Sequence, residues 1–407
     1  MTFIKLIFVN RYFYPDHSAT SQLLSDLVFF LAARGFRVEV VTSAQRYDDP
    51  AASLPDGERC RGVLIHRVRG LRFGRESLPG RLLDCLSFFW SAFLRLRQVV
   101  ARGDCVVVKT DPPLISIPAA LVARWRGAIL INWLQDVFPE IATELGIMAA
   151  GGAMGRLTRA MRDWSLRRAR INVVVGTRMA SLCARRGIAR EAIAYIPNWA
   201  DELTIRPMAP DLNPLRMRWG LRDAFVVGYS GNLGRAHEFE TLLGAAELLR
   251  AQPDLIFLFI GAGALMAALR QAVAVRGLRN FRFKPCQPRA GLSESLSVPD
   301  VHLVVLRPGF EGLMVPSKFY GVAAAGRAIL YVGDREGEIP RLIAHAGAGW
   351  TIAPGESAAL AAHILDLRDH RSECRAMGLN ARRLVETRFP VGRALAAWAA
   401  LLAPWKG

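Results

Sequence analysis

The sequence predicts an α/β protein made of two doubly wound domains. Short apolar runs alternate with amphipathic segments along the chain, which is typical of strands and helices that build parallel sheets. The alternation stops at 201–224, where Pro207, Pro210, Pro214 and Gly220 interrupt it, and restarts at Phe225. We therefore expect a linker at 201–224, and a cleft between two α/β/α sandwiches.

The chain opens with a strand, a loop and a helix. Residues 4–9 are apolar and form the expected first strand, residues 21–34 carry leucines at helical spacing, and residues 37–42 form the next strand. Ligands of doubly wound sheets lie at the carboxyl ends of strands, so residues 10–20 are a candidate site. This loop lacks the Gly-x-Gly-x-x-Gly pattern of dinucleotide-binding proteins, so a dehydrogenase is the least favoured class.

The rest of the first half continues the alternation after a polar loop at 43–60. Strands are expected at 63–67, 105–109, 128–134, 171–175 and 193–196, and helices at 80–100, 114–126 and through residue 170. Asp136 and Glu140 follow the strand 128–134. A carboxylate at a strand end can orient or deprotonate a hydroxyl nucleophile, although an isolated Asp there also fits a helix cap or a loop salt bridge.

The segment 80–100 combines aromatic and aliphatic bulk with flanking arginines. Phe88, Phe89, Trp90 and Phe93 are interleaved with basic residues, as in a helix that lies against anionic lipid. A helix that packs in a protein core has the same composition. Both interpretations stay open at this stage.

The second half repeats the strand and helix pattern. Strands are expected at 225–229, 255–260, 281–284, 301–306 and 328–332, with helices to residue 250, to about residue 276, at 292–296, 358–367, 371–387 and 394–402. The stretch 311–326, EGLMVPSKFYGVAAAG, reads as a strand end, a loop and a helix opened by Pro316. Such a loop can bind an anion, and Lys318 adds charge, although an ordinary strand-to-helix turn has the same features.

Composition narrows the function. Apolar residues make up 52% of the 407 residues, no uncharged apolar run is long enough to span a bilayer, and no signal peptide is apparent, which favours a cytoplasmic protein. Six cysteines without a CxxC pair predict free thiols and no metal site. The net charge of +18 favours an anionic partner, either a membrane surface or a pyrophosphate substrate. No nucleic-acid motif is present, and the basic cluster 167–170 also fits a solvated helix face.

Three loops of the second half are expected to converge: 230–237, 261–263 and 311–318. The first two are small and rich in glycine, so their backbone can approach a ligand. Arg235 and Lys318 stand on separate loops, and together they would neutralise a diphosphate without a metal ion. No Asp-x-Asp occurs in the chain, so a metal-chelating nucleotide-sugar site has no support.

The motifs TDPPLISIP, LQDVFPE, IPNWAD, YSGNLGR and EGLMVPSKFYGVAAAG, in this order, resemble those of the family 4 retaining glycosyltransferases. The resemblance is strongest to bacterial members that build exopolysaccharide or O-antigen units on lipid carriers. It implies the GT-B fold, with an acceptor-binding Rossmann-like domain at 1–200, a nucleotide-sugar-binding one at 201–390, and a helix at 391–407 that crosses back to the first domain.

The resemblance also implies site residues. Glu311 matches the first acid of the family's E-x7-E motif, near the donor sugar, whereas Phe319 stands where the second acid is expected and leaves the ribose contact unassigned. Asp136 falls where many relatives have a catalytic His, and is the second catalytic candidate. The donor-binding residues implied are Ser230, Gly231, Asn232, Arg235, His237, Gly261, Gly263, Gly312, Leu313, Met314 and Lys318. The acceptor-binding residues implied are Asn10, Tyr14, Ser18 and Thr20.

The expected protein is therefore a metal-independent, retaining glycosyltransferase without a cofactor. It would transfer sugar from a nucleoside-diphosphate sugar to a lipid-linked saccharide in cell-surface polysaccharide biosynthesis, at the inner face of the plasma membrane. A nucleotide-sugar epimerase and a phosphorylase share the two-domain plan. An epimerase would need no acceptor, and a phosphorylase would need inorganic phosphate or a cofactor lysine. A non-catalytic membrane-associated scaffold would bind the donor without turnover.

Overall fold

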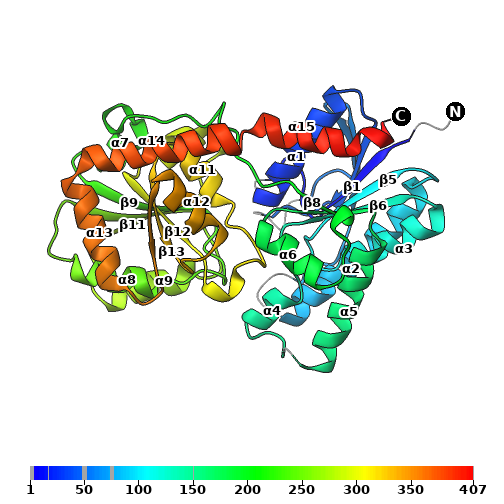
Figure 1. Cartoon of the computed structure of the whole chain (residues 1–407), viewed down its shortest axis with the longest axis horizontal. Helices are drawn as coiled ribbons and strands as arrows, with labels where there is room; N and C mark the ends of the chain where they lie inside the picture. The colour runs from blue at the N-terminus through cyan, green and yellow to red at the C-terminus, as the bar shows by residue number, and fades with distance from the viewer. Residues whose placement is uncertain (1–3, 17, 48–52, 74–77, 150, 407) are drawn as a thin grey trace. The chain divides into compact units, whose positions relative to one another are not determined.

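The computed structural model describes residues 4–16, 18–47, 53–73, 78–149 and 151–406, which form two compact units (Figure 1). Unit 1 runs to Pro197 and also takes in the chain from Gly392 onward, and unit 2 runs from Asn198 to Val391. Each unit is built on a sheet, fully parallel in unit 2 and parallel except at one edge in unit 1, with helices on its faces. Among the described residues, no helix has the length and apolar character that a membrane span requires.

Unit 1 contains an eight-stranded sheet in the order β3-β4-β2-β1-β5-β6-β7-β8. Its strands are β1 Leu6–Val9, β2 Val38–Ser43, β3 Gly57–Cys60, β4 Val63–Val68, β5 Cys105–Lys109, β6 Ile129–Leu134, β7 Ile171–Val174 and β8 Ile193–Tyr195. All neighbours are parallel except β3 and β4. From β1 the chain first adds strands toward one edge of the sheet, and from β5 it adds them toward the other edge. The switch point therefore lies between β1 and β5, and doubly wound sheets bind ligands at this point.

Helices cover both faces of this sheet. They are α1 Ala19–Ala33, α2 Leu78–Val99, α3 Ser116–Arg126, α4 Glu140–Glu144, α5 Ala153–Arg168, α6 Thr177–Arg185 and α15 Val391–Leu402. Ile7 and Val106 pack with α2 and α3 in one core layer. On the opposite face the rings of Trp133 and Trp398 lie 4.6 Å apart, which fixes α15 to the sheet. The central strands β1 and β5 are buried along their whole length, as expected for strands covered on both faces.

Unit 2 contains a six-stranded, fully parallel sheet in the order β11-β10-β9-β12-β13-β14. Its strands are β9 Phe225–Ser230, β10 Leu255–Ile260, β11 Phe281–Lys284, β12 Val301–Val305, β13 Ala328–Val332 and β14 Gly349–Ile352. Its helices are α7 Pro214–Arg218, α8 Glu240–Leu248, α9 Met266–Val275, α10 Leu292–Ser297, α11 Lys318–Ala324, α12 Glu338–Ala346, α13 Ser357–Asp369 and α14 Arg371–Arg388. This is the 3-2-1-4-5-6 order of dinucleotide-binding folds, with its switch point between β9 and β12.

The segment 201–224, which the sequence predicted as a linker, is folded as part of unit 2. It contains α7, and Arg216 on this helix is almost fully buried. Its guanidinium donates hydrogen bonds to the carbonyl oxygens of Leu221 and Val298 and forms an ion pair with Asp300 at 3.0 Å. A buried arginine that is paired on several sides ties the segment into unit 2. The proline and glycine residues mark turns within a folded segment.

Candidate functional site

The loops after β9 and β12 meet at the switch point of unit 2, where Lys318 is the central residue. The Lys318 ammonium donates a hydrogen bond to the Tyr229 hydroxyl and lies 4.0 Å from the centre of the Tyr229 ring. It also lies 3.2 Å from Nε2 of His237. These contacts join the end of β9, the loop that follows it and the start of α11. Because α11 has only seven residues, the charge of Lys318 is the main attraction for an anion here.

The surroundings of Lys318 change the protonation of all three groups. Burial lowers the pKa of Lys318 to about 7, because an ammonium that is removed from water loses its hydration. Burial and the neighbouring Lys318 lower the pKa of His237 to about 3, so the imidazole is neutral at physiological pH. Burial also raises the pKa of the Tyr229 hydroxyl. The cluster therefore holds at most one positive charge, on a lysine that gains or loses its proton near pH 7.

Two glycines of the loop after β10 allow this loop to lie directly on the loop after β9. Gly263 has a φ of 142°, and a Cβ at this position would lie 2.4 Å from the backbone nitrogen of Leu233. A Cβ on Gly261 would lie 2.2 Å from the carbonyl oxygen of Gly231. Hydrogen bonds from Leu233 N to Ala262 O and from Leu265 N to Leu233 O join the two loops. The predicted donor-binding glycines thus shape the loop that carries His237.

Glu311 lies in the loop after β12, and its carboxylate accepts hydrogen bonds from β13 and α12. Its Oε1 accepts a hydrogen bond of 2.7 Å from the Tyr331 hydroxyl, and its Oε2 one of 3.4 Å from the backbone nitrogen of Glu338 at the start of α12. Glu311 and Met314 form an isolated β-bridge that closes the loop around Gly312 and Leu313. The carboxylate is therefore held in a fixed orientation.

Phe319 explains why the second acid of the motif has no counterpart here. Its side chain is fully buried, and its ring packs against Tyr320 at 5.3 Å and Phe389 at 6.5 Å. A carboxylate in this position would lie in the core of unit 2, where an unpaired charge is strongly unfavourable. The family spacing places the second acid at residue 319, whose side chain here faces the core of unit 2. The preceding residue, Lys318, is the first residue of α11.

The remaining donor-binding candidates lie on the loop after β9. Asn232 and Arg235 are exposed, so both side chains can reach a ligand in solvent. The Ser230 hydroxyl is buried at the end of β9 and has no hydrogen-bond partner among the described residues. His237, and not Arg235, is the residue of this loop that contacts Lys318. The structure thus gathers Tyr229, which the sequence reasoning omitted, with two of the predicted residues.

The acceptor-binding candidates lie at the switch point of unit 1, in and after the loop that follows β1. Asn10 is fully buried and donates to the carbonyl oxygen of Tyr12. Ser18 caps α1 by accepting a hydrogen bond from Ser21 N. Thr20 belongs to the first turn of α1, and its carbonyl oxygen accepts a hydrogen bond from Lys109. Tyr14 remains 42% exposed, with its ring against Phe29, and is the candidate of this group most open to a ligand.

Asp136 lies at the carboxyl end of β6 beside a lysine that the sequence reasoning did not single out. Burial raises the pKa of Asp136 to about 6, although a hydrogen bond with Thr110 and the nearby Lys109 favour the ionised form. One carboxylate oxygen, Oδ1, is buried and has no hydrogen-bond partner among the described residues. Lys109 and Asp136 both line a cavity of about 30 Å³, enough for a water molecule.

Lys109 connects the end of β5 to α1 and β6 at the switch point of unit 1. Burial lowers its pKa to about 7, partly offset by Asp111 and Asp136. Its ammonium lies 3.9 Å from the centre of the Trp133 ring and donates to Thr20 O at 2.8 Å. The sequence feature that could have indicated Lys109 is a lysine at the end of the otherwise apolar strand 105–109.

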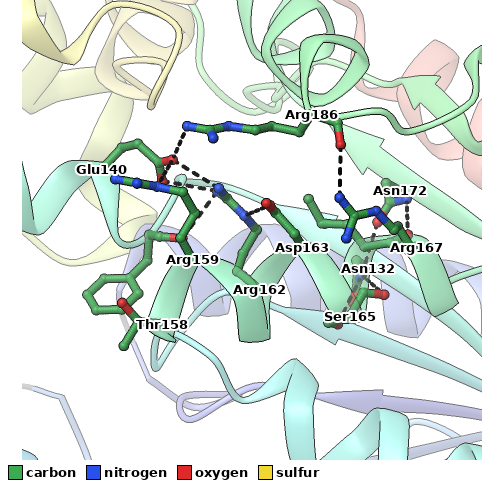
Figure 2. A network of polar contacts seen from close by, with 12 residues as sticks. Asn132, Glu140, Thr158, Arg159, Arg162, Asp163, Ser165, Arg167, Asn172 and Arg186 are labelled. Carbon is green, nitrogen blue, oxygen red and sulfur yellow. Dashed lines mark hydrogen bonds and ion pairs between the residues drawn. The ribbon is translucent and has the colours of Figure 1, made fainter. Parts of the chain in front are cut away.

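Glu140 serves a structural network in unit 1 (Figure 2). Arg162 donates to both of its carboxylate oxygens, at 2.9 and 3.0 Å, and Arg186 donates to Oε1 at 3.1 Å. Arg159 forms a third ion pair at 3.5 Å. Burial raises the pKa of Glu140, but the hydrogen bonds and charge of Arg162 outweigh burial and leave it below its usual value. The carboxylate thus joins α4, α5 and α6, as a loop salt bridge would.

Among the described residues, no group of three or more His, Cys, Asp or Glu side chains could hold a metal ion. The cysteines Cys60, Cys85, Cys105, Cys183, Cys286 and Cys374 are free thiols.

Comparison with known proteins identifies both units. Residues 22–199 match a family described as "Glycosyl transferase 4-like domain", and residues 224–370 match "Glycosyl transferases group 1". The chain is 30% identical to the probable glycosyltransferase WbjE of Pseudomonas aeruginosa, over 71% of this chain and 73% of that protein. It is 27% identical to the putative colanic acid biosynthesis glycosyl transferase WcaI of Escherichia coli K12, over 83% and 86% respectively.

Solved structures agree on the fold. The structure of Anabaena HepE in complex with UDP-glucose matches with a TM-score of 0.73 and 16% identity, over 98% of this chain and 100% of that one. Two parallel α/β sheets in one chain, each with its own switch point, are the architecture that the motifs predicted. The chain therefore belongs to the glycosyltransferases of the GT-B fold, with a glycosyl transferase 4-like domain followed by a group 1 domain, as its family 4 motifs indicated.

Proposed function

We propose that this enzyme transfers a sugar from a nucleoside-diphosphate sugar to a lipid-linked saccharide in cell-surface polysaccharide biosynthesis, without a metal ion and with retention of the anomeric configuration. The observation that carries the proposal is the Lys318 cluster, in which the ammonium of a half-buried lysine lies at the switch point of unit 2. A diphosphate that leaves as an anion is stabilised by a protonated lysine that is already held in position.

The rest of the donor site fits the same ligand. Arg235 is exposed on the loop that carries His237, so its planar guanidinium can add a bidentate contact to phosphate. The buried hydroxyl of Ser230 supplies a further polar group at the strand end. Glu311, with its carboxylate fixed by Tyr331 and α12, can accept hydrogen bonds from sugar hydroxyls. The UDP-glucose complex of HepE supports a nucleotide sugar as ligand of this fold.

The acceptor is proposed to bind in unit 1, where Asp136 is the base or orienting group for its hydroxyl. A carboxylate with a pKa of about 6 is largely ionised near neutral pH yet basic enough to accept a proton. Tyr14 would contact the saccharide. The names of WbjE and WcaI, the second placed in colanic acid biosynthesis, support a polysaccharide product. A lipid-linked acceptor would bring the enzyme to the inner face of the plasma membrane.

The test begins with a thermal-shift screen of nucleotide sugars, since a donor that binds the folded state raises its melting temperature. With the selected donor, Lys318→Ala and Arg235→Ala should each lower kcat/KM at least about tenfold, the effect of losing one charge-assisted hydrogen bond. Arg375→Ala, at an exposed position of α14, is the matched control and should leave kcat/KM unchanged. The proposal fails if both site variants keep the wild-type kcat/KM.

Two further measurements complete the test. The anomeric configuration of the product, determined by NMR, must equal that of the donor, and activity must survive treatment with EDTA. Turnover of the donor without any acceptor would instead indicate an epimerase. Donor binding without turnover against a pool of lipid-linked saccharides would indicate a scaffold.

A further inference from the structure

Helix α2 carries an apolar stripe on its outward face. Leu83, Leu86, Trp90 and Leu94 recur at intervals of three and four residues and therefore lie along one side of the helix. Trp90 is 63% exposed and Leu86 49% exposed. The opposite side of the same helix is buried in the core of unit 1 through Phe88, Ala92 and Leu96. The helix thus has two apolar sides, and the described residues cover only one of them.

Helix α3 extends this apolar surface. Trp125 is 63% exposed, and its ring meets Phe93 of α2 edge to face at 5.7 Å. Phe93 in turn stacks on Trp90 at 5.9 Å. The Arg97 guanidinium lies 6.0 Å from the centres of both the Phe93 and Trp125 rings. Two exposed tryptophans are therefore held in one cluster that an arginine borders.

The exposed charged side chains of helices α2, α3 and α5 are all arginines. Helices α2, α3 and α5 pack beside one another on the same side of the sheet (Figure 1), and they carry three, two and five arginines respectively. Two of the five on α5, Arg159 and Arg162, pair with Glu140 and do not contribute to the exposed charge. Their only carboxylates are Asp84 and Asp163, and both are buried. The exposed apolar cluster is thus bordered by arginines without an exposed carboxylate on these helices.

A hollow between α3 and α5 adds a concave part to the same surface. It has a volume of about 190 Å³ and is lined by small apolar residues, including Ala120 and Ala123, and by Trp164. Arg124 and Arg168 also line it, and both are exposed. An apolar floor with two guanidinium groups suits a phospholipid, whose phosphate can pair with arginine while its glycerol and first methylene groups contact the alanines.

We propose that the outer surface of α2, α3 and α5 docks on an anionic phospholipid membrane, with Trp90 and Trp125 inserted at the interface between head groups and acyl chains. Tryptophan favours this interface, and exposed arginines are attracted to anionic head groups. A second copy of this chain is the less suitable occupant, because two arginine-rich surfaces would repel each other. The inference rests on the proposed lipid-linked acceptor for its purpose, but neither donor nor acceptor is needed to test it.

The test is a flotation assay with vesicles of phosphatidylcholine, alone or with phosphatidylglycerol. The site variant is Trp90→Glu with Trp125→Glu. The matched control is Leu248→Glu with Val275→Glu, which adds the same two charges at helix positions of unit 2 that are 61% and 80% exposed. We expect the site variant to need a vesicle concentration at least about tenfold higher for half binding, and the control to bind as the wild type does.

A second variant separates lipid binding from misfolding. Arg124→Gln with Arg168→Gln removes charge without touching the tryptophans, and it should weaken binding to phosphatidylglycerol vesicles while Arg375→Gln with Arg383→Gln does not. All variants should keep the wild-type melting temperature. The inference is wrong if the wild type fails to float with anionic vesicles, or if the site variants and controls float equally. It is also wrong if sedimentation shows a dimer that the tryptophan variant dissociates.

Turnover with the selected donor and a water-soluble acceptor analogue is measured on the same variants. Because the surface contains none of the proposed donor- or acceptor-binding residues, turnover should stay within about twofold of the wild type. If the surface variants lose vesicle binding but keep full turnover, the result supports a membrane-binding role of this surface that is separate from catalysis. Normal vesicle binding without turnover of any nucleotide sugar would overturn the proposed function and leave the surface standing.

Discussion

Donor affinity should fall steeply as the pH rises above neutral, because the charge on Lys318 is lost there. Burial lowers the pKa of this ammonium to about 7 in the unliganded protein. A bound diphosphate favours the protonated form and raises that pKa, so binding above pH 7 must take up a proton. The sign is therefore fixed: the affinity is highest at or below pH 7 and decreases as the pH rises.

The magnitude follows from the fraction of protein that carries the charge. With a pKa of about 7, about half of the Lys318 side chains are charged at pH 7 and about 1% at pH 9. If only the charged form binds well, the apparent Kd rises about fiftyfold over this interval. His237 does not contribute, because its pKa of about 3 keeps it neutral throughout. The nucleotide sugar is a diphosphate diester, so the charge on its phosphates stays constant.

Isothermal titration calorimetry checks this expectation directly. The Kd of the selected donor is measured at pH 7, 8 and 9, in buffers of different ionisation enthalpy that report the protons taken up. Lys318→Met should bind weakly at every pH and take up no proton. A Kd that stays constant from pH 7 to pH 9 in the wild type would refute the role of Lys318, as would proton uptake that persists in the variant.

Three other predictions concern the loops and the network. Asp136→Asn should lower kcat at least about a hundredfold, and the wild-type rate should rise with pH through about 6 as the carboxylate ionises; an unchanged pH profile in the variant would exclude Asp136 as the base. Gly263→Ala should lower the free energy of unfolding by about 2 kcal/mol or more, because its Cβ would overlap the backbone of Leu233. Gly277→Ala is its control in chemical denaturation, since it also has a positive φ but nothing within 4 Å of its Cβ. Glu140→Ala should lower the same free energy by about 3 kcal/mol, measured in the same way, because three arginines lose their shared carboxylate.

Elements with a clear apolar pattern could be predicted from the sequence, and weakly patterned ones could not. The buried strands β1, β5, β9 and β10 are short apolar runs and were expected where they occur. Strand β3 was missed because its residues are GERC, with alternating exposure at the sheet edge and almost no apolar signal. Such a strand is determined by its antiparallel pairing with β4, which is a tertiary property.

The candidate site shows the same division. A lysine after an apolar strand pointed to an anion site, and its position at the switch point of unit 2 follows from strand order. The sequence could not show that His237, rather than the more basic Arg235, lies against Lys318. Nor could it show that Phe319 faces the core, because a two-residue difference in where α11 begins turns a side chain from the loop surface inward. Boundaries of short helices depend on tertiary packing.

Both units have a lysine at the switch point of the sheet, but the number of carboxylates near that lysine differs. This difference favours donor binding in unit 2 and acceptor binding in unit 1. Each switch point holds a lysine whose pKa burial lowers to about 7: the almost fully buried Lys109 in unit 1 and the half-buried Lys318 in unit 2. The carboxylates of Asp111 and Asp136 partly raise the pKa of Lys109, whereas the pKa of Lys318 is lowered by burial, with no opposing carboxylate among the described residues. A buried cation without a compensating carboxylate attracts an anion, and one beside two carboxylates does not. Charge pairing within each unit thus supports a diphosphate ligand for unit 2 and a neutral hydroxyl substrate for unit 1.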